Sequence, residues 1–107
     1  GMTREIALEV KAHLNDEFAR CILGLYRDAA QPAMIKLGAR FTAASPQNGL
    51  VIIAANDHFA GSAEQMQQFA AGVNAKIANI PEAGHWWMIE RPALAASILI
   101  NHWQSKN

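Results

Sequence analysis

The sequence of 107 residues contains a single cysteine and few charged residues. Because Cys21 has no second cysteine to pair with, an internal disulfide is excluded, and a reducing, cytoplasmic compartment fits best. Nine basic and nine acidic side chains cancel, and neither sign forms a run. The sequence therefore lacks the basic surface that is typical of proteins that bind nucleic acids or anionic membranes.

Long hydrophobic runs are also missing, although 51% of the residues are hydrophobic. No stretch approaches the roughly 18 consecutive apolar residues of a transmembrane helix, and we expect no signal peptide and no membrane partner. The composition is that of a globular chain, and the length suits one domain with a modest core. We assign this domain to residues 3–107 and interpret residues 1–2 as a tag remnant and the start methionine.

The N-terminal part of the chain carries three helical patterns. Apolar residues four apart predict a helix over Thr3–His13, with Thr3 as its N-cap. Asn15 is a candidate cap of a second helix, which ends near Ala30. Pro32 suits the first turn of a third, short helix over 32–39, and the composition of 41–49 predicts a loop.

The C-terminal part predicts the order strand, helix, strand, helix. Leu50–Ala54 (LVIIA) is a continuous apolar run typical of a strand buried on both faces, and Lys76–Ile80 (KIANI) is a second strand. Between them, Ser62 and Gln65 have the spacing of a capping box, and Pro92 begins the last helix. The sequence therefore predicts an α/β protein in which N-terminal helices precede a βαβα unit with parallel strands.

Two residues suited to acid–base chemistry follow the two predicted strands. Asp57 comes shortly after the first strand and His85 shortly after the second. Because the carboxyl ends of parallel strands meet at one edge of a sheet, about 4.8 Å apart, we expect the carboxylate and the imidazole to lie close together. Such a carboxylate fixes the tautomer of the ring and leaves the other nitrogen free as a general base. The alternative is that His85 only shapes its loop.

Three stretches together resemble the C-terminal part of the α/β-hydrolase superfamily: GLVIIAAND at 49–57, IPEAGHWW at 80–87 and ERP at 90–92. In that superfamily the triad acid follows the penultimate strand and the histidine follows the last one. The helices before residue 50 resemble the segment that joins the cap region to the penultimate strand. The resemblance covers about residues 16–103. It implies a partial α/β-hydrolase fold with Asp57 as the triad acid and His85 as the general base.

The nucleophile of that superfamily is missing, because the sequence contains no G-x-S-x-G motif. Ser45 lies in a predicted loop, Ser62 is explained as a cap, and Cys21 lies in the middle of a helix. Without a nucleophile and oxyanion donors, an aspartate and a histidine cannot carry out acyl transfer. We therefore expect a hydrolase part that is inactive alone: a natural short gene product, a truncated gene model or a fragment, with a separate N-terminal half as a possible partner. Ester, epoxide and carbon–halide substrates all stay open.

Trp86 and Trp87 follow His85 directly and are candidate substrate contacts, although packing is the commoner role of tryptophan. His58 and His85 suggest a metal site together with Asp57. However, three ligands on two loops, without a helix-spaced pair, do not form a typical metal site. We therefore expect no metal and no cofactor.

The predicted strand Leu50–Ala54 lacks the neighbour that a complete hydrolase would place on its second side. Because an unpaired apolar edge is an aggregation hazard, we expect a homodimer in which this strand pairs antiparallel with its own copy. Alternatively, the N-terminal helices exchange between protomers and cover the edge. The second function class is accordingly a small, non-enzymatic dimeric module whose vestigial cleft binds a small apolar ligand.

Overall fold

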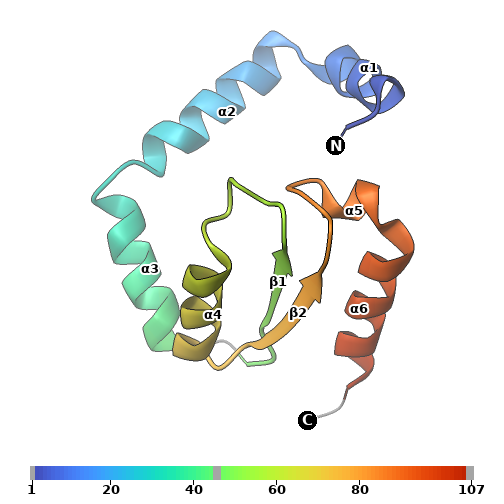
Figure 1. The fold of residues 1–107 in the computed structure, drawn as a ribbon. Coiled ribbons are helices and arrows are strands. Elements are labelled where there is room, and N and C mark those ends of the chain that lie inside the picture. Colours follow the sequence, from blue (N-terminus) through green and yellow to red (C-terminus); the bar gives the residue numbers. More distant parts are fainter. Residues whose placement is uncertain (1, 45–46, 106–107) are drawn as a thin grey trace. The chain divides into compact units, whose positions relative to one another are not determined.

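The computed structural model describes residues 2–44 and 47–105 of the chain. The chain divides into two compact units, Met2–Ala44 and the part that follows it (Figure 1). Within the described ranges, none of the helices has both the length and the apolar character needed to cross a membrane. The assignment of residues 3–107 to one domain stays a prediction.

The first unit consists of three helices: α1 (Arg4–His13), α2 (Asp16–Asp28) and α3 (Ala33–Ala44). The Thr3 hydroxyl accepts a hydrogen bond from the N–H of Ile6 at 3.3 Å, and the Asn15 side chain accepts one from Phe18 at 2.8 Å. These bonds satisfy backbone donors that a helix leaves free in its first turn. The predicted starts of the first two helices are therefore confirmed.

The third helix is longer than the sequence predicted. The segment 41–49 was expected to be a loop, yet α3 continues through residues 41–44. Phe-Thr-Ala-Ala contains no helix breaker, alanine has the highest helix propensity, and the Thr42 hydroxyl donates back to the carbonyl of Gly38 at 3.1 Å. The loop prediction relied on the composition at the end of the segment and did not take these local helix preferences into account. Residues 45–46, which carry Ser45, lie outside the described residues.

The second unit contains two parallel strands, β1 (Leu50–Ala54) and β2 (Lys76–Ile80), with Leu50 opposite Lys76 and Ala54 opposite Ile80. Helix α4 (Ala63–Gly72) connects them, and both hydrogen bonds of its Ser62–Gln65 capping box are present. The short helix α5 (Trp87–Glu90) and the longer α6 (Pro92–Gln104) follow. The α/β class and the parallel βαβα order are confirmed, whereas α5 was not predicted.

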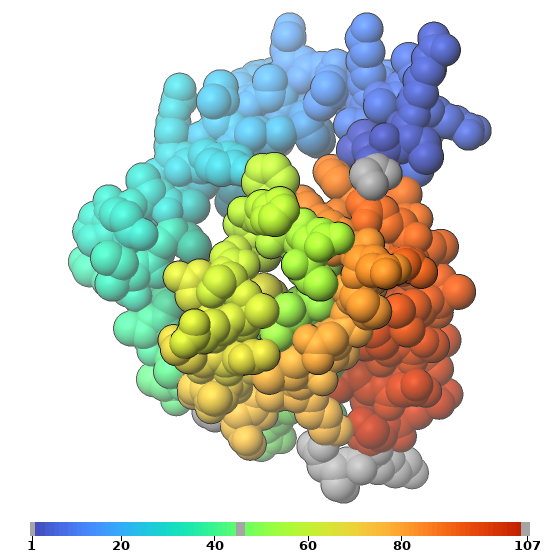
Figure 2. Space-filling model, in the orientation of Figure 1, coloured from blue at the N-terminus to red at the C-terminus, as the bar shows by residue number. Residues whose placement is uncertain are grey.

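A small core holds the second unit together. Ala54, Ile80, Ala83 and Ala95 are buried and in contact, and Ile52, Trp87 and Ile98 pack against them. On the face seen in Figure 2, the side chains of β2 and α6 lie side by side. Only the last two residues of β1 are buried, so burial of the whole strand on both faces was a wrong prediction. The reason is that β1 has a strand neighbour on one side alone among the described residues.

Polar contacts fix the end of α6 to the start of the sheet. His102 donates from Nε2 to the carbonyl oxygen of Asn48 at 2.8 Å, and Lys76 donates from Nζ to the hydroxyl of Ser105 at 2.9 Å. These contacts lie at the amino ends of the strands. At their carboxyl ends, β1 and β2 continue into the two loops that carry Asp57 and His85.

Candidate functional site

The loops that follow β1 and β2 are tied together by backbone hydrogen bonds. The N–H of Ala55 donates to the carbonyl of Ile80 at 3.1 Å, and the N–H of Asn56 donates to the carbonyl of Ala83 at 2.9 Å. These bonds extend the strand ladder past the ends of both strands. The two loops therefore leave the sheet side by side.

Asp57 uses its two carboxylate oxygens for different partners. Oδ1 accepts hydrogen bonds from the backbone N–H groups of Phe59 at 2.8 Å and Ala60 at 3.2 Å. Oδ2 lies 3.0 Å from Nδ1 of His85. One oxygen thus fixes the turn of its own loop, and the other reaches the neighbouring loop. The predicted contact between the two residues is confirmed.

The pairing determines the state of the imidazole. A carboxylate only accepts hydrogen bonds, so Nδ1 of His85 carries the proton in this contact. In the neutral ring the lone pair is then on Nε2, which bonds to no described residue. The His85 side chain is 49% exposed whereas that of Asp57 is 8% exposed, so a reactant can reach the histidine and water is largely excluded from its partner.

The surroundings of Asp57 favour its ionised form. The N–H of Phe59 is the main cause that holds the pKa of Asp57 below its usual value, and burial acts in the opposite direction. The hydrogen bonds from His85 and Ala60 lower this pKa further. The carboxylate therefore stays charged at neutral pH, where it can stabilise a protonated imidazole.

Two aromatic rings flank the imidazole of His85. The centroid of the Phe59 ring lies 5.2 Å away at 58°, and that of Trp86 lies 6.0 Å away at 82°. Trp87, in contrast, packs against the core. The two candidate tryptophans therefore differ, and only Trp86 keeps substrate contact as a prediction. Phe59 was not a candidate, although its place two residues after Asp57, in the turn that this carboxylate caps, could have indicated it.

Glu90 holds the loop of His85 from the opposite end. Its Oε2 accepts a hydrogen bond from the N–H of Gly84 at 2.8 Å, directly before the histidine. A Cβ atom at Gly84 would lie 3.6 Å from both the carbonyl oxygen of Asn56 and Oε1 of Glu90, so the loop passes close to both. This contact could not be predicted from the sequence, because Glu90 follows Gly84 at no regular helix or strand spacing.

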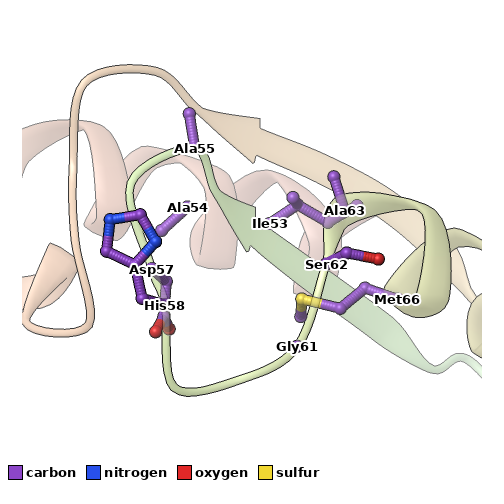
Figure 3. A pocket seen from close by; sticks show the side chains of 9 residues that line it. All are labelled: Ile53, Ala54, Ala55, Asp57, His58, Gly61, Ser62, Ala63 and Met66. Atoms are coloured by element: carbon purple, nitrogen blue, oxygen red, sulfur yellow. The ribbon is translucent and has the colours of Figure 1, made fainter.

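A cavity of about 350 Å³ opens beside the carboxyl end of β1. Figure 3 shows the imidazole of His58 at one end of it and the side chains of Ser62 and Met66 at the other. Its lining consists of Ile53, Ala54, Ala55, Asp57, His58, Gly61, Ser62, Ala63 and Met66. The volume falls within the range of small-molecule sites, about 300–1,000 Å³.

The described part of the second unit, 47–105, supplies no hydroxyl to His85. Ser62 accepts from the N–H of Gln65, Ser97 donates to the carbonyl of Leu94, and Ser105 donates to the carbonyl of His102. Over the described ranges of the whole chain, no three histidine, cysteine or acidic side chains are grouped so that they could hold a metal ion. His58 therefore does not complete a metal site with Asp57 and His85.

Comparison of the chain with known protein families, with curated proteins and with solved structures found no match. The resemblance to the α/β-hydrolases therefore stays a prediction from the sequence motifs.

Proposed function

We propose that Asp57 and His85 are the acid–base pair of a hydrolytic centre of the α/β-hydrolase type, and that about residues 16–103 correspond to the C-terminal part of such an enzyme. One observation carries the proposal: Asp57 fixes its own turn through Oδ1 while Oδ2 holds Nδ1 of His85 at 3.0 Å. A carboxylate placed only to cap a turn needs no second partner.

In such a centre, Nε2 of His85 takes the proton from an attacking hydroxyl, thiol or water. The imidazolium that forms is stabilised by ionised Asp57, and the same proton passes to the leaving group when the bond to it breaks. The exposed position of His85 and the largely buried carboxylate support these roles. Trp86, whose ring meets the imidazole edge-on, is the candidate for substrate contact.

The centre needs a nucleophile and oxyanion donors from outside residues 47–105. No serine in that range is bonded to His85, and each one has a local partner instead. We therefore expect no saturable ester hydrolysis by the chain alone. A separate N-terminal half that carries a nucleophile elbow, G-x-S-x-G where the nucleophile is serine, would complete the centre. The identity of its nucleophile would decide between ester, epoxide and carbon–halide substrates.

Co-expression from the native locus tests this proposal. If the adjacent DNA encodes a product with G-x-S-x-G, that product and this chain together should give a serine that reacts with a fluorophosphonate probe. His85→Ala should abolish the labelling. The control His13→Ala should leave it intact, because the His13 imidazole lies in α1 and bonds to the carbonyl of Glu9. Labelling that survives His85→Ala, or a labelled serine in the chain on its own, would overturn the proposal.

A second candidate function is a non-enzymatic dimeric module that binds a small apolar ligand. The cavity beside β1 supports it in part, because Ile53, Ala54 and Met66 line one side of a cavity whose lining also includes the polar Asp57, His58 and Ser62. In that case an apolar fluorescent probe should bind to the chain alone, and Met66→Trp, which fills the cavity, should prevent binding. Equal binding of the probe to the wild-type chain and to Met66→Trp would exclude this cavity as the site.

A further inference from the structure

The outer edge of β1 carries backbone groups without partners. Ala55 N–H bonds to Ile80 and Lys76 N–H bonds to Gly49, so in this parallel ladder the odd-numbered residues of β1 direct their backbone groups toward β2. The N–H groups of Leu50, Ile52 and Ala54 consequently point away from the sheet. None of them donates to a described residue.

Nothing in the sequence of β1 blocks this edge. Soluble proteins protect free edges with lysine, proline, bulges or a covering element, yet LVIIA contains none of these residues. An apolar cavity of about 400 Å³ runs along the edge, lined by Leu50, Val51 and Ile52 together with Met66 and Phe69 of α4. Since successive strand residues point to opposite faces, a cavity lined by all three lies along the edge and not on one face.

We propose that a second copy of this chain covers the edge, with β1 paired antiparallel to its own copy about a two-fold axis at Ile52. The pairing would produce a four-stranded sheet in the order β2–β1–β1–β2. This inference rests on the edge of β1 and concerns the chain on its own, because an N-terminal half that completed a hydrolase sheet would pair with the same edge. The two Asp57–His85 pairs would lie at opposite ends of the sheet, because the paired strands run in opposite directions.

The direction of the free backbone groups, together with the pairing of all five residues of β1, selects this register. In an antiparallel pair, residues that face each other through hydrogen bonds both direct N–H and C=O toward the partner strand. With the axis at Ile52, Ile52 faces the partner's Ile52 and exchanges two hydrogen bonds with it. The N–H of Ala54 donates to the carbonyl of the partner's Leu50, and the partner's Ala54 donates to Leu50 by symmetry. The carbonyl of Ala54 already accepts the N–H of Asp57 at 3.1 Å. A shift by one residue would place inward-facing groups opposite outward-facing ones.

The side chains fit the same register. Leu50 is placed opposite the partner's Ala54, which sets a large side chain against a small one. Val51 is placed opposite the partner's Ile53, a pair of β-branched residues of the kind that stabilises neighbouring strands. No charge is opposed to a like charge, because β1 has none. The edge is therefore complementary to itself, and a C₂ interface requires this property.

Amide exchange on the wild-type chain tests the proposal directly. Light scattering should show a species of twice 11.7 kDa. In this dimer the N–H of Ile52 should be protected at least about 100-fold against exchange, comparable to the inward-facing N–H of Val51. A monomer in which Ile52 exchanges freely while Val51 is protected overturns the proposal. A monomer with protected Ile52 also overturns it, since the chain itself would then cover the edge.

Two cysteine variants test the register. In a Cys21→Ser background, Ile52→Cys brings two cysteines opposite each other with Cα atoms about 5.5 Å apart, a distance that a disulfide spans. The matched control Leu50→Cys leaves its two cysteines about 14 Å apart, four strand residues from each other. Oxidation should therefore cross-link the first variant and not the second. Equal cross-linking of both would overturn the two-fold register.

Ile52→Pro tests the role of the outward N–H. Proline removes that donor without removing a bond to β2 and should weaken dimerisation about 5- to 150-fold. Ile52→Ala shortens the same side chain and keeps the N–H, so a dimer equally weakened by both variants would contradict backbone pairing at this edge. The tautomer of His85 reports on the acid–base pair separately, so failure of the dimer and failure of the proposed function are distinguishable.

Discussion

The two units of the chain differ in how much of their sequence becomes buried. The first two helices of the first unit begin at clear caps, yet no residue in α1, α2 or α3 is buried. The second unit has no stronger local signals, but segments distant in sequence meet in its core around Ile80. Local sequence patterns are thus enough to specify the helices of the first unit. Long-range packing and the candidate acid–base pair occur in the second unit, where the paired strands bring two loops together. Substitutions matched between the two units can test this difference.

The largest contrast is expected from two isoleucines. Ile80 is fully buried, and Ile80→Ala should lower the free energy of unfolding by about 2–5 kcal/mol through lost burial and a cavity. Ile35 in α3 is 65% exposed, so Ile35→Ala should change it by less than about 0.5 kcal/mol. Urea denaturation measures both. Equal effects would mean that the first unit buries Ile35 after all.

A smaller contrast is expected from two helix caps. Ser62→Ala breaks the capping box of α4, which links the two strands, and should cost about 1 kcal/mol in the cooperative unfolding of the second unit. Thr3→Ala removes the corresponding bond at α1 and should reduce helical circular dichroism while leaving that transition in place. A shift of the transition by Thr3→Ala would show that the two units unfold together.

The smallest effect concerns pH. Because the pKa of Asp57 is lower in the folded state, its contribution to stability is complete above its unfolded pKa of about 3.9 and is lost as the pH falls through the folded value. Asp57→Asn keeps an oxygen for the N–H groups of Phe59 and Ala60 and has no charge to lose. The stability difference between wild type and variant should therefore shrink as the pH falls from 5 to 2, by about the amount that this one pKa shift accounts for. A constant difference over that range would contradict the lowered pKa.

The sequence predicted those features that depend on neighbouring residues or on strand order. The caps at Thr3, Asn15 and Ser62 follow from residues three positions apart. The contact of Asp57 with His85 follows from matching positions after two parallel strands, because the strand ladder brings their loops together.

The features that the sequence did not predict depend on packing or on finely balanced propensities. Helix α3 runs past its expected end, since composition is a weak guide to a helix terminus. Phe59 beside the imidazole and Glu90 beneath Gly84 depend on how the loops fold over the sheet. No periodicity in the sequence encodes such contacts.

Nitrogen-15 NMR of the His85 imidazole, in wild type and in Asp57→Asn, tests the acid–base pair most directly. The pairing of Oδ2 with Nδ1 predicts that the neutral wild-type ring carries its proton on Nδ1. In the variant an amide replaces that oxygen, so the proton should shift toward Nε2 while the Phe59 and Ala60 amides stay hydrogen-bonded. A wild-type ring protonated on Nε2, or a tautomer that the substitution does not change, would contradict the role of Asp57 as the partner of a general base.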